Sequence, residues 1–232
     1  MTPPEFERAR SAEAKRIRET VILDEAARLA TEHGVRTVTL TDIAAAVGMH
    51  KSAMLRYFET REEIFLRLSA SGWTDWSQAV RDRLGQLEKQ SDDAGVKDPE
   101  ALIPAIAGIL ADSLVARPLF CDLLAHTPLN LERGVSLVAV KSFKMSVIAE
   151  YTAVGTALCE ILPLAPSQAG DAVATATAMA GALWQMAAVG TELRRFYEET
   201  PELSHALIDV APRLTGILTA LLRGYCADAQ KA

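Results

Sequence analysis

A glycine flanked by two short amphipathic segments is the feature that most constrains the fold of this chain. From Thr39 to Phe58 the sequence reads TLTDIAAAVGMHKSAMLRYF, with Gly48 near its middle. Apolar residues spaced three and four apart on both sides of the glycine predict one helix before it and one after it. The glycine itself favours a tight turn with a positive φ angle. Two helices joined in this way form a helix-turn-helix, in which Lys51–Phe58 is the predicted DNA-reading helix.

The composition indicates a folded, all-α protein. Half of the 232 residues are hydrophobic, and no segment sustains the strict alternation of apolar and polar residues that predicts strands. No apolar run reaches the ~18 residues of a membrane span, and the charged N-terminus lacks the apolar region of a signal peptide. We therefore expect a cytoplasmic protein, in which the three widely separated cysteines are reduced thiols.

The acidic residues are unevenly distributed along the chain. Residues 1–67 contain 11 basic and 11 acidic residues, whereas residues 68–232 contain 13 and 19, so the second part carries the whole net charge of −6. A DNA-reading segment without an overall positive charge must bind through a few well-placed cations. We expect residues 1–67 to form the DNA-binding domain and residues 68–232 a second, larger helical domain.

Helix signals continue along the rest of the sequence. A first helix is predicted from Ala12 to His33, because the prolines before it disfavour an earlier start and Gly34 suits its end. With the two helices of the helix-turn-helix this gives three N-terminal helices. Further helices are predicted over residues 60–87, 99–116, 136–162, 168–190 and 202–225, with a short one around Phe120, which makes about nine in total.

The second helix of the helix-turn-helix carries the candidate DNA contacts, since side chains of a helix in the major groove meet base edges and phosphates. Lys51 in its first turn opposes the helix dipole by about 0.3–1 kcal/mol, which favours a DNA contact over a solvated lysine. Ser52 and Ala53 are small enough to let the helix approach the bases. Thr39 and Thr41 either cap the preceding helix or donate to phosphates. The full set is Thr39, Thr41, His50, Lys51, Ser52, Ala53, Leu55, Arg56, Tyr57 and Arg61.

One combination of residues spans both helices and the start of the next: Thr39, Ile43-Ala44, Gly48, Lys51, Tyr57-Phe58 and Arg61-Glu62-Glu63-Ile64. In this order it resembles the DNA-binding signature of TetR-family (tetracycline-repressor-like) transcriptional regulators and covers about residues 12–67. The resemblance implies a ligand-binding and dimerising C-terminal domain. It also implies a homodimeric repressor that leaves its operator DNA when a small-molecule effector binds. The segment 117–136 is similar to the middle of one TetR-type C-terminal subfamily.

The chain departs from the family pattern at four positions. Ala53 and Leu55 stand where Thr and Tyr are usual, and His50 stands where Ser is usual. Arg61 stands where Lys is usual, which keeps the charge. Leu55 cannot donate a hydrogen bond to a phosphate, so it cannot make the backbone contact that the family's tyrosine hydroxyl makes. More of the binding then falls to Lys51, Arg56 and the other polar residues of this stretch.

The effector site is predicted among bulky residues of the C-terminal domain, between the 99–116 helix and the long helices that follow. The scarcity of charge in residues 168–190 favours an apolar or aromatic effector. The bulky residues available are either ligand walls or simple core: Phe120, Phe143, Met145, Tyr151, Trp184 and Met186.

The last two long helices have wide apolar faces that allow two interpretations. They form either the core of a monomer or a two-fold four-helix bundle between two copies. A single helix-turn-helix covers few bases, so a DNA reader favours the homodimer on a palindromic operator. The candidate interface residues are Leu207, Leu214, Ile217, Leu218 and Leu221.

No motif of an enzyme is found: the sequence has no Gly-rich phosphate loop after a strand, no HExxH and no GxSxG. Cys121 and His126 lie five residues apart without further metal ligands nearby. We therefore expect neither a metal nor a cofactor. The alternatives to a repressor are a helical dimeric interaction protein with a weakened helix-turn-helix, and a regulator that activates.

Overall fold

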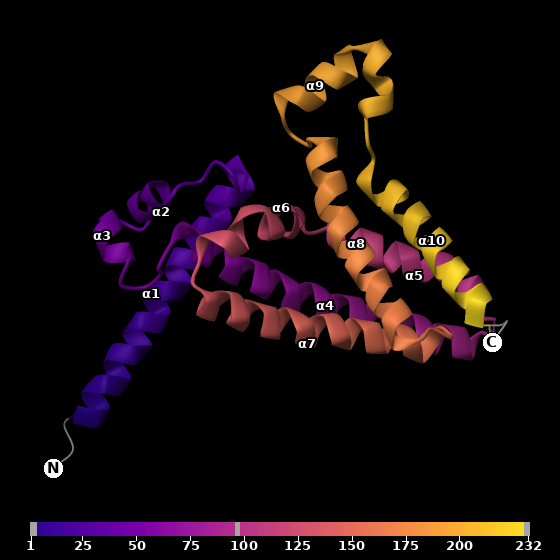
Figure 1. Ribbon diagram of the computed structural model, residues 1–232, viewed down its shortest axis with the longest axis horizontal. Helices are drawn as coiled ribbons and strands as arrows, with labels where there is room; N and C mark the ends of the chain where they lie inside the picture. Colours follow the sequence, from indigo (N-terminus) through magenta and orange to yellow (C-terminus); the bar gives the residue numbers. More distant parts are fainter. Residues whose placement is uncertain (1–3, 96–97, 230–232) are drawn as a thin grey trace.

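The computed structural model describes residues 4–95 and 98–229, and over this part the chain is all-α, as the sequence predicts (Figure 1). Ten α-helices and three short 3₁₀ or π segments follow one another, without a strand among the described residues. The additional helix relative to the expected nine is α9 (Glu192–Glu199), which lies in a stretch not predicted as helical. Figure 1 shows a small group of helices at one side, joined by the long α4 to a larger group at the other.

The small group, here called the head, contains α1 (Pro4–His33), α2 (Leu40–Ala46) and α3 (Lys51–Met54). α1 begins eight residues before the predicted start at Ala12. The prediction was wrong because a proline is tolerated in the first turn of a helix, where its missing N–H has no helical partner.

Glycines make the two turns of the head. Gly34 follows α1 with a φ of +83°, and Gly48 separates α2 from α3 with a φ of +65°. Both values lie in the left-handed region, which a residue without a Cβ adopts at little cost. The predicted roles of both glycines are therefore confirmed.

α3 is shorter than the predicted Lys51–Phe58. After Met54 the backbone continues in tighter turns, in which the amide of Tyr57 donates to the carbonyl of Met54 at 2.9 Å. Met54 and Phe58 are both fully buried, so the chain turns inward at this point to place both side chains in the head's core. Periodicity alone located the apolar face correctly but not the end of the helix.

The head has a hydrophobic core of its own, to which α1, α2, α3 and the start of α4 each contribute. Part of α6 and α7 closes it from the side of the larger group. Its fully buried members from the head and α4 include Ile22, Ala26, Ile43, Met54, Phe58, Ile64 and Phe65.

α4 (Arg61–Asp93) runs from the head into the larger group without a break at residue 67. Its N-terminus is capped by Thr60, whose hydroxyl accepts a hydrogen bond from the amide of Glu63 at 3.2 Å. The boundary between residues 67 and 68 stays a prediction, since one continuous helix belongs to both parts.

The larger group, here called the body, is built around α4. Figure 1 shows α7 lying along α4, and α8 and α10 lying beside α5. No single helix among the described residues is long and apolar enough to cross a membrane. The remaining elements are α5 (Pro99–Val115), α6 (Pro118–His126), a π segment (Thr127–Leu131), a 3₁₀ turn (Glu132–Gly134), α7 (Leu137–Ile161), α8 (Pro166–Ala187), a 3₁₀ segment (Pro201–Ala206) and α10 (Val210–Ala229).

Candidate nucleic-acid interface

The N-terminus of α2 is fixed by a reciprocal pair of hydrogen bonds. The hydroxyl of Thr39 accepts from the amide of Asp42 at 3.2 Å, and the carboxylate of Asp42 accepts from the amide of Thr39 at 2.8 Å. The Thr39 hydroxyl also donates to this carboxylate at 2.7 Å, and this bond is the main cause that lowers the pKa of Asp42. Thr39 therefore caps α2, while Thr41 lies exposed in its first turn.

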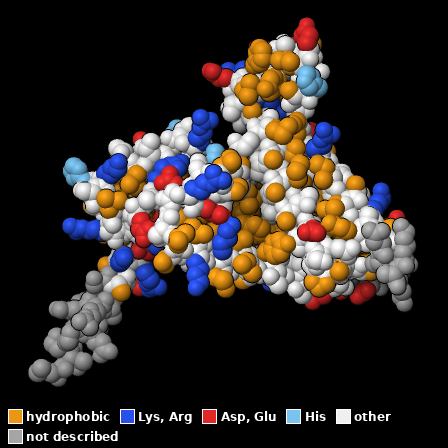
Figure 2. Space-filling view, viewed as in Figure 1, with side chains coloured by type: hydrophobic (Ala, Val, Ile, Leu, Met, Phe, Trp, Pro, Cys, Tyr) orange, Lys and Arg blue, Asp and Glu red, His pale blue; other side chains and the backbone are white. Residues whose placement is uncertain are grey.

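α3 presents a polar surface supported by its buried side. Met54 faces the core, while Ala53 and Tyr57 are half-buried beside it. Figure 2 shows blue basic side chains around the part of the molecule that α1, α2 and α3 form in Figure 1. The predicted contacts that stand exposed on α3 and next to it are His50, Lys51, Ser52, Leu55 and Arg56.

His50 and Lys51 begin α3 without the usual stabilising partners. His50 occupies the N-cap position, but its side chain makes no capping hydrogen bond. Lys51 follows directly and is exposed. The short α3 therefore begins with two exposed side chains, His50 and Lys51, that are open to a negatively charged partner such as a phosphate.

Arg61 does not point outward as a phosphate contact requires. Its guanidinium donates to the backbone carbonyls of Val35 and Val38, in the turn between α1 and α2. It also pairs with Glu62 at 3.0 Å and lies over the ring of Phe65, 4.5 Å from the centroid. With 14% of its side chain exposed, Arg61 holds the turn in place, and the structure gives no support to its predicted role in DNA contact.

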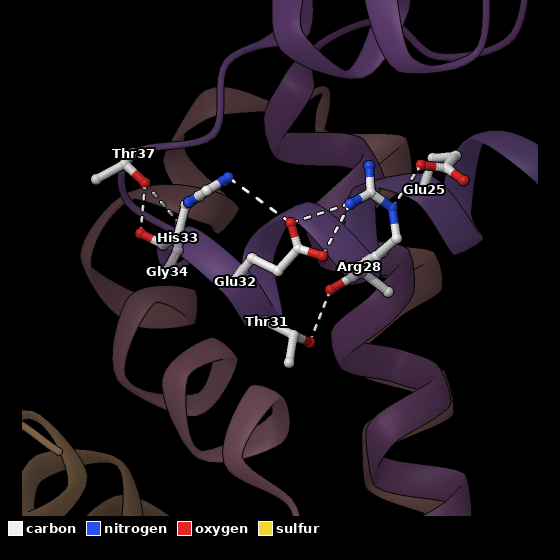
Figure 3. A network of polar contacts seen from close by, with 8 residues as sticks. Glu25, Arg28, Thr31, Glu32, His33, Gly34 and Thr37 are labelled. Carbon is white, nitrogen blue, oxygen red and sulfur yellow. Dashed lines mark hydrogen bonds and ion pairs between the residues drawn. The ribbon is translucent and has the colours of Figure 1, made fainter. Parts of the chain in front are cut away.

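The C-terminal turn of α1 is tied together by a surface network (Figure 3). Figure 3 shows the guanidinium of Arg28 between Glu25 and Glu32. It donates to the two carboxylates at 2.9 and 2.8 Å. The hydrogen bonds that Arg28 donates to these two carboxylates, that to Glu25 first, raise the pKa of Arg28. The hydroxyl of Thr37 donates to the carbonyl of His33 at 2.6 Å, which extends the network into the following turn.

The structure separates the six residues predicted for the effector site. Phe120 is buried against Trp73, Phe143 is buried, and Tyr151 and Trp184 are half-buried. Met145 and Met186 are 60% and 57% exposed, on outward faces of α7 and α8. Helical spacing predicted that these side chains lie on helices but not which way each helix faces.

Two of the hollows of ligand size that these residues line lie in the body. A hollow of about 450 Å³ lies where α4, α6, the π segment, α7 and α8 meet, and Phe143 lines it. A second, of about 610 Å³, lies among α8, α9 and the start of α10, and Trp184 lines it. Figure 2 shows hydrophobic side chains gathered over the area between α6, α7 and α8.

The predicted dimer residues are largely used inside the protomer. Leu214 and Leu218 are completely buried in the core that α10 shares with α5 and α8, so they are not available to a partner and their assignment was wrong. Ile217 and Leu221 are half-buried against the same core, and Leu207 is half-buried before α10.

The exposed faces of α8 and α10 instead carry small residues at helical spacing. The sequence of residues 168–190 is visibly rich in small residues, whereas in α10 the small residues stand beside a larger apolar stripe. The exposed small residues are Ala174, Ala178 and Ala182 on α8, and Gly216, Ala220 and Gly224 on α10.

The cysteines form no disulfide in the structure. Burial raises the pKa of the Cys121 thiol to about 12, and the neighbouring Asp122 adds to the shift. Within the described residues, no three His, Cys, Asp or Glu side chains are grouped as a metal site requires.

Two family models match the chain and together cover most of it. Residues 22–68 match the model of bacterial regulatory proteins, tetR family, and residues 70–229 match that of the tetracyclin repressor-like C-terminal domain. None of the curated proteins has a matching sequence.

Solved structures with the same fold come from several bacteria. The fatty acid degradation regulator FadR from Bacillus halodurans is 15% identical, with a TM-score of 0.55 over 88% of this chain and 94% of that one. A putative TetR-family regulator from Mesorhizobium loti is 12% identical, with a TM-score of 0.53 over 92% and 97%. The TetR-family regulator PfmR from Thermus thermophilus is 17% identical, with a TM-score of 0.51 over 87% and 94%. At these identities the likeness concerns the fold.

Proposed function

The chain belongs to the TetR family of DNA-binding transcriptional regulators, and from this premise we propose that it is a homodimeric repressor of a palindromic operator. In this proposal a small apolar or aromatic effector binds the body and releases the protein from DNA. The carrying observation is the exposed surface of α3 and of the turn after it. Lys51 and Ser52 stand exposed on α3, Arg56 stands exposed in the following turn, and the buried Met54 anchors both.

The chemistry of this face suits the major groove. Lys51 and Arg56 supply the two cations that pair with guanine edges or phosphates, and Ser52 allows close approach. Leu55 is 55% exposed in the same row and offers an apolar contact to a thymine methyl group. Because the first 67 residues are neutral overall, these few side chains set the affinity.

The hollow of about 450 Å³ is the proposed effector site. Its volume lies within the range of small-molecule sites, and Trp73, Phe143 and Val147 give it apolar walls. The charged pair at its edge, Lys144 and Glu132, is 2.6 Å apart and therefore neutralised. An uncharged apolar or aromatic molecule fits these walls best.

The remaining features of the proposal follow from the family. TetR-family proteins act by binding DNA, so we assign no catalytic step, metal or cofactor to this chain. We propose that it works in the cytoplasm, with residues 1–67 as the DNA-binding domain and residues 68–232 as the effector-binding and dimerisation domain. α4 is the mechanical link between the two.

The proposal is tested by selecting genomic DNA fragments on the purified protein and measuring its affinity for the recovered sequence. We expect a shared near-palindrome. Replacing Lys51 or Arg56 by alanine should weaken binding by about 1–3 kcal/mol and reduce the slope of log affinity against log salt by about one per cation. Lys89→Ala, near the far end of α4, is the matched control and should bind like the wild type.

The result that would contradict the proposal is equally clear. If the selection recovers no common palindrome, the protein has no palindromic operator, and the proposed repressor function is refuted. Weakening by Lys89→Ala as large as that by Lys51→Ala would show that binding follows overall charge rather than α3.

A further inference from the structure

The carboxylate of Asp122, on α6, lies where three distant parts of the chain meet. Its Oδ2 accepts a hydrogen bond from the amide of Val35 at 2.7 Å, and its Oδ1 accepts one from the Nε2 of Gln185 at 2.7 Å. The Nε2 of His126 lies 3.4 Å from Oδ1. The side chain of Asp122 is 14% exposed, with its bond to Val35 partly buried and its bond to Gln185 at the surface.

Val35 belongs to the turn that leads from α1 into α2. Its carbonyl accepts from Arg61 of α4, while its amide donates to Asp122 of α6. The side chains of Val35 and Val38 are buried at 1% and 3% exposure. Thr39, the cap of α2, follows directly, so the position of this turn sets where α2 and α3 lie.

On the other side of Asp122, its hydrogen-bond partner Gln185 belongs to α8. Gln185 lies in the last turn of α8 and lines the proposed effector hollow, as do Leu124 and Ala125 of α6. α6 and α8 also touch through their backbones, since a Cβ added to Gly181 would lie 2.8 Å from the amide nitrogen of Ala125. A displacement of α8 therefore cannot occur without moving α6 or breaking this contact.

We propose that Asp122 is the positioning residue that joins α8 to the turn before α2, and so couples the effector domain to the DNA-reading helix. The inference rests on the proposed function, because it names the route between the two sites of that function. The chain of contacts runs from Gln185 to Asp122, from Asp122 to the amide of Val35, and from the carbonyl of Val35 to Arg61.

A carboxylate suits this joint for a physical reason. Two oxygens accept from two elements at once, and hydrogen bonds to a charged acceptor are stronger than neutral ones. An apolar side chain at position 122 would leave the amide of Val35 without this partner in a partly buried place. The link between α8 and the turn before α2 therefore requires both hydrogen bonds of Asp122, the one from Val35 and the one from Gln185.

The test measures amide hydrogen exchange in the full-length protein. Gln185→Ala should speed exchange of the Val35 amide about threefold to tenfold, although Gln185 does not bond to Val35, because a weakened anchor loosens Asp122. Gln168→Ala is the matched control: it removes one hydrogen bond of α8, to the amide of Ala165 at 2.9 Å, at the other end of the helix. The control should leave the Val35 rate unchanged.

Two further variants establish that the effect passes through Asp122. In an Asp122→Ala background, Gln185→Ala should add no further change to the Val35 rate. Asp122→Asn should speed exchange less than Asp122→Ala does, because its amide oxygen still accepts from Val35, although as a neutral and weaker acceptor, and Gln185 can turn its own oxygen to the new NH₂ group. An unchanged Val35 rate in Gln185→Ala, or a rate in Asp122→Asn as fast as in Asp122→Ala, overturns the proposal.

Operator binding separates this inference from the function on which it rests. If the wild type recovers no palindromic DNA, the proposed function fails, while the exchange rates still decide whether the joint exists. If an operator is bound, Gln185→Ala should change its affinity and Gln168→Ala should not. Equal effects of the two variants on affinity would mean that α8 acts on the head by another route, which contradicts the proposal.

Discussion

The carboxyl group of Asp122 experiences opposing influences on its pKa. Burial raises the pKa, but hydrogen bonds involving His126, the amide of Val35 and Gln185 together outweigh it, so the pKa lies below its ordinary value. A carboxyl whose pKa is lowered by folding stabilises the protein above the pKa of the unfolded chain, about 3.9. This contribution is lost as the pH falls through the folded-state pKa.

We therefore expect Asp122→Asn to be less stable than the wild type at about pH 7, with the difference shrinking as the pH falls below about 4. Urea unfolding at both pH values measures the free energies. Asp75→Asn, at an exposed position of α4, is the control and should change little at either pH. A difference for Asp122→Asn that is the same at both pH values would argue against a lowered pKa.

Arg61 allows a test between a clamp on the turn and a contact with DNA. Its guanidinium is engaged by the carbonyls of Val35 and Val38, so Arg61→Ala should lower the free energy of unfolding by about 1–3 kcal/mol. Operator affinity should fall through misplacement of α3, without the loss of about one unit of salt slope that Lys51→Ala produces. The operator affinities of Arg61→Ala and Lys51→Ala are measured over a range of salt concentrations. A reduced slope of log affinity against log salt for Arg61→Ala would support the phosphate contact predicted for Arg61.

At the scale of elements, the sequence was sufficient to predict turns and helix ends where a single residue determines the backbone conformation. Gly34 and Gly48 were predictable because their positive φ angles favour glycine, and Thr60 because a hydroxyl three residues before Glu63 caps a helix. The inward turn of Arg61 was not predictable, since its acceptors are carbonyls of a turn more than twenty residues earlier.

Apolar stripes predicted less of the structure than capping residues did. Periodicity identifies the apolar face of a helix but not the element against which that face packs. The stripe of α10 was correctly seen, yet Leu214 and Leu218 pack against α5 and α8 of the same chain. For the same reason, the predicted effector residues do not lie together in the structure. Phe120 packs on the tryptophans of α4, whereas Met145 faces outward. Choosing between an inner and an outer neighbour requires the tertiary arrangement.

The hollow among α4, α6, α7 and α8 leads to a prediction at this scale. Val147→Trp adds a large side chain to its wall and should abolish binding of a neutral apolar dye such as N-phenylnaphthylamine, while operator binding persists. Fluorescence titration measures the first and a mobility shift the second. Lys141→Trp, at an exposed position of α7 that does not line the hollow, is the control. Unchanged dye binding in Val147→Trp would place the effector elsewhere, with the hollow near Trp184 as the next site to test.

At the scale of the whole molecule, we propose that the two copies of the proposed homodimer meet through the exposed small residues of α8 and α10. The two helices are neighbours, since the hydroxyl of Tyr225 donates to the carboxylate of Asp171 at 3.3 Å. Helices with small side chains can approach a partner closely, and two such pairs make a two-fold four-helix bundle. Ala178 and Ala182 also line the proposed effector hollow, so this arrangement puts the partner at its mouth.

Charged substitutions test this arrangement without disturbing the core. Ala174→Glu and Ala220→Glu place carboxylates on exposed positions of α8 and α10, and burial of either charge between two copies would be unfavourable. We expect monomers by light scattering, with helix content and the unfolding temperature of the protomer retained, and a large loss of operator affinity because a palindrome needs both heads. Ala105→Glu, exposed on α5, should remain dimeric. If both variants elute as dimers, the two copies meet through another face, and the exposed apolar residues of α7, Leu137, Met145 and Ile148, become the surface to substitute next.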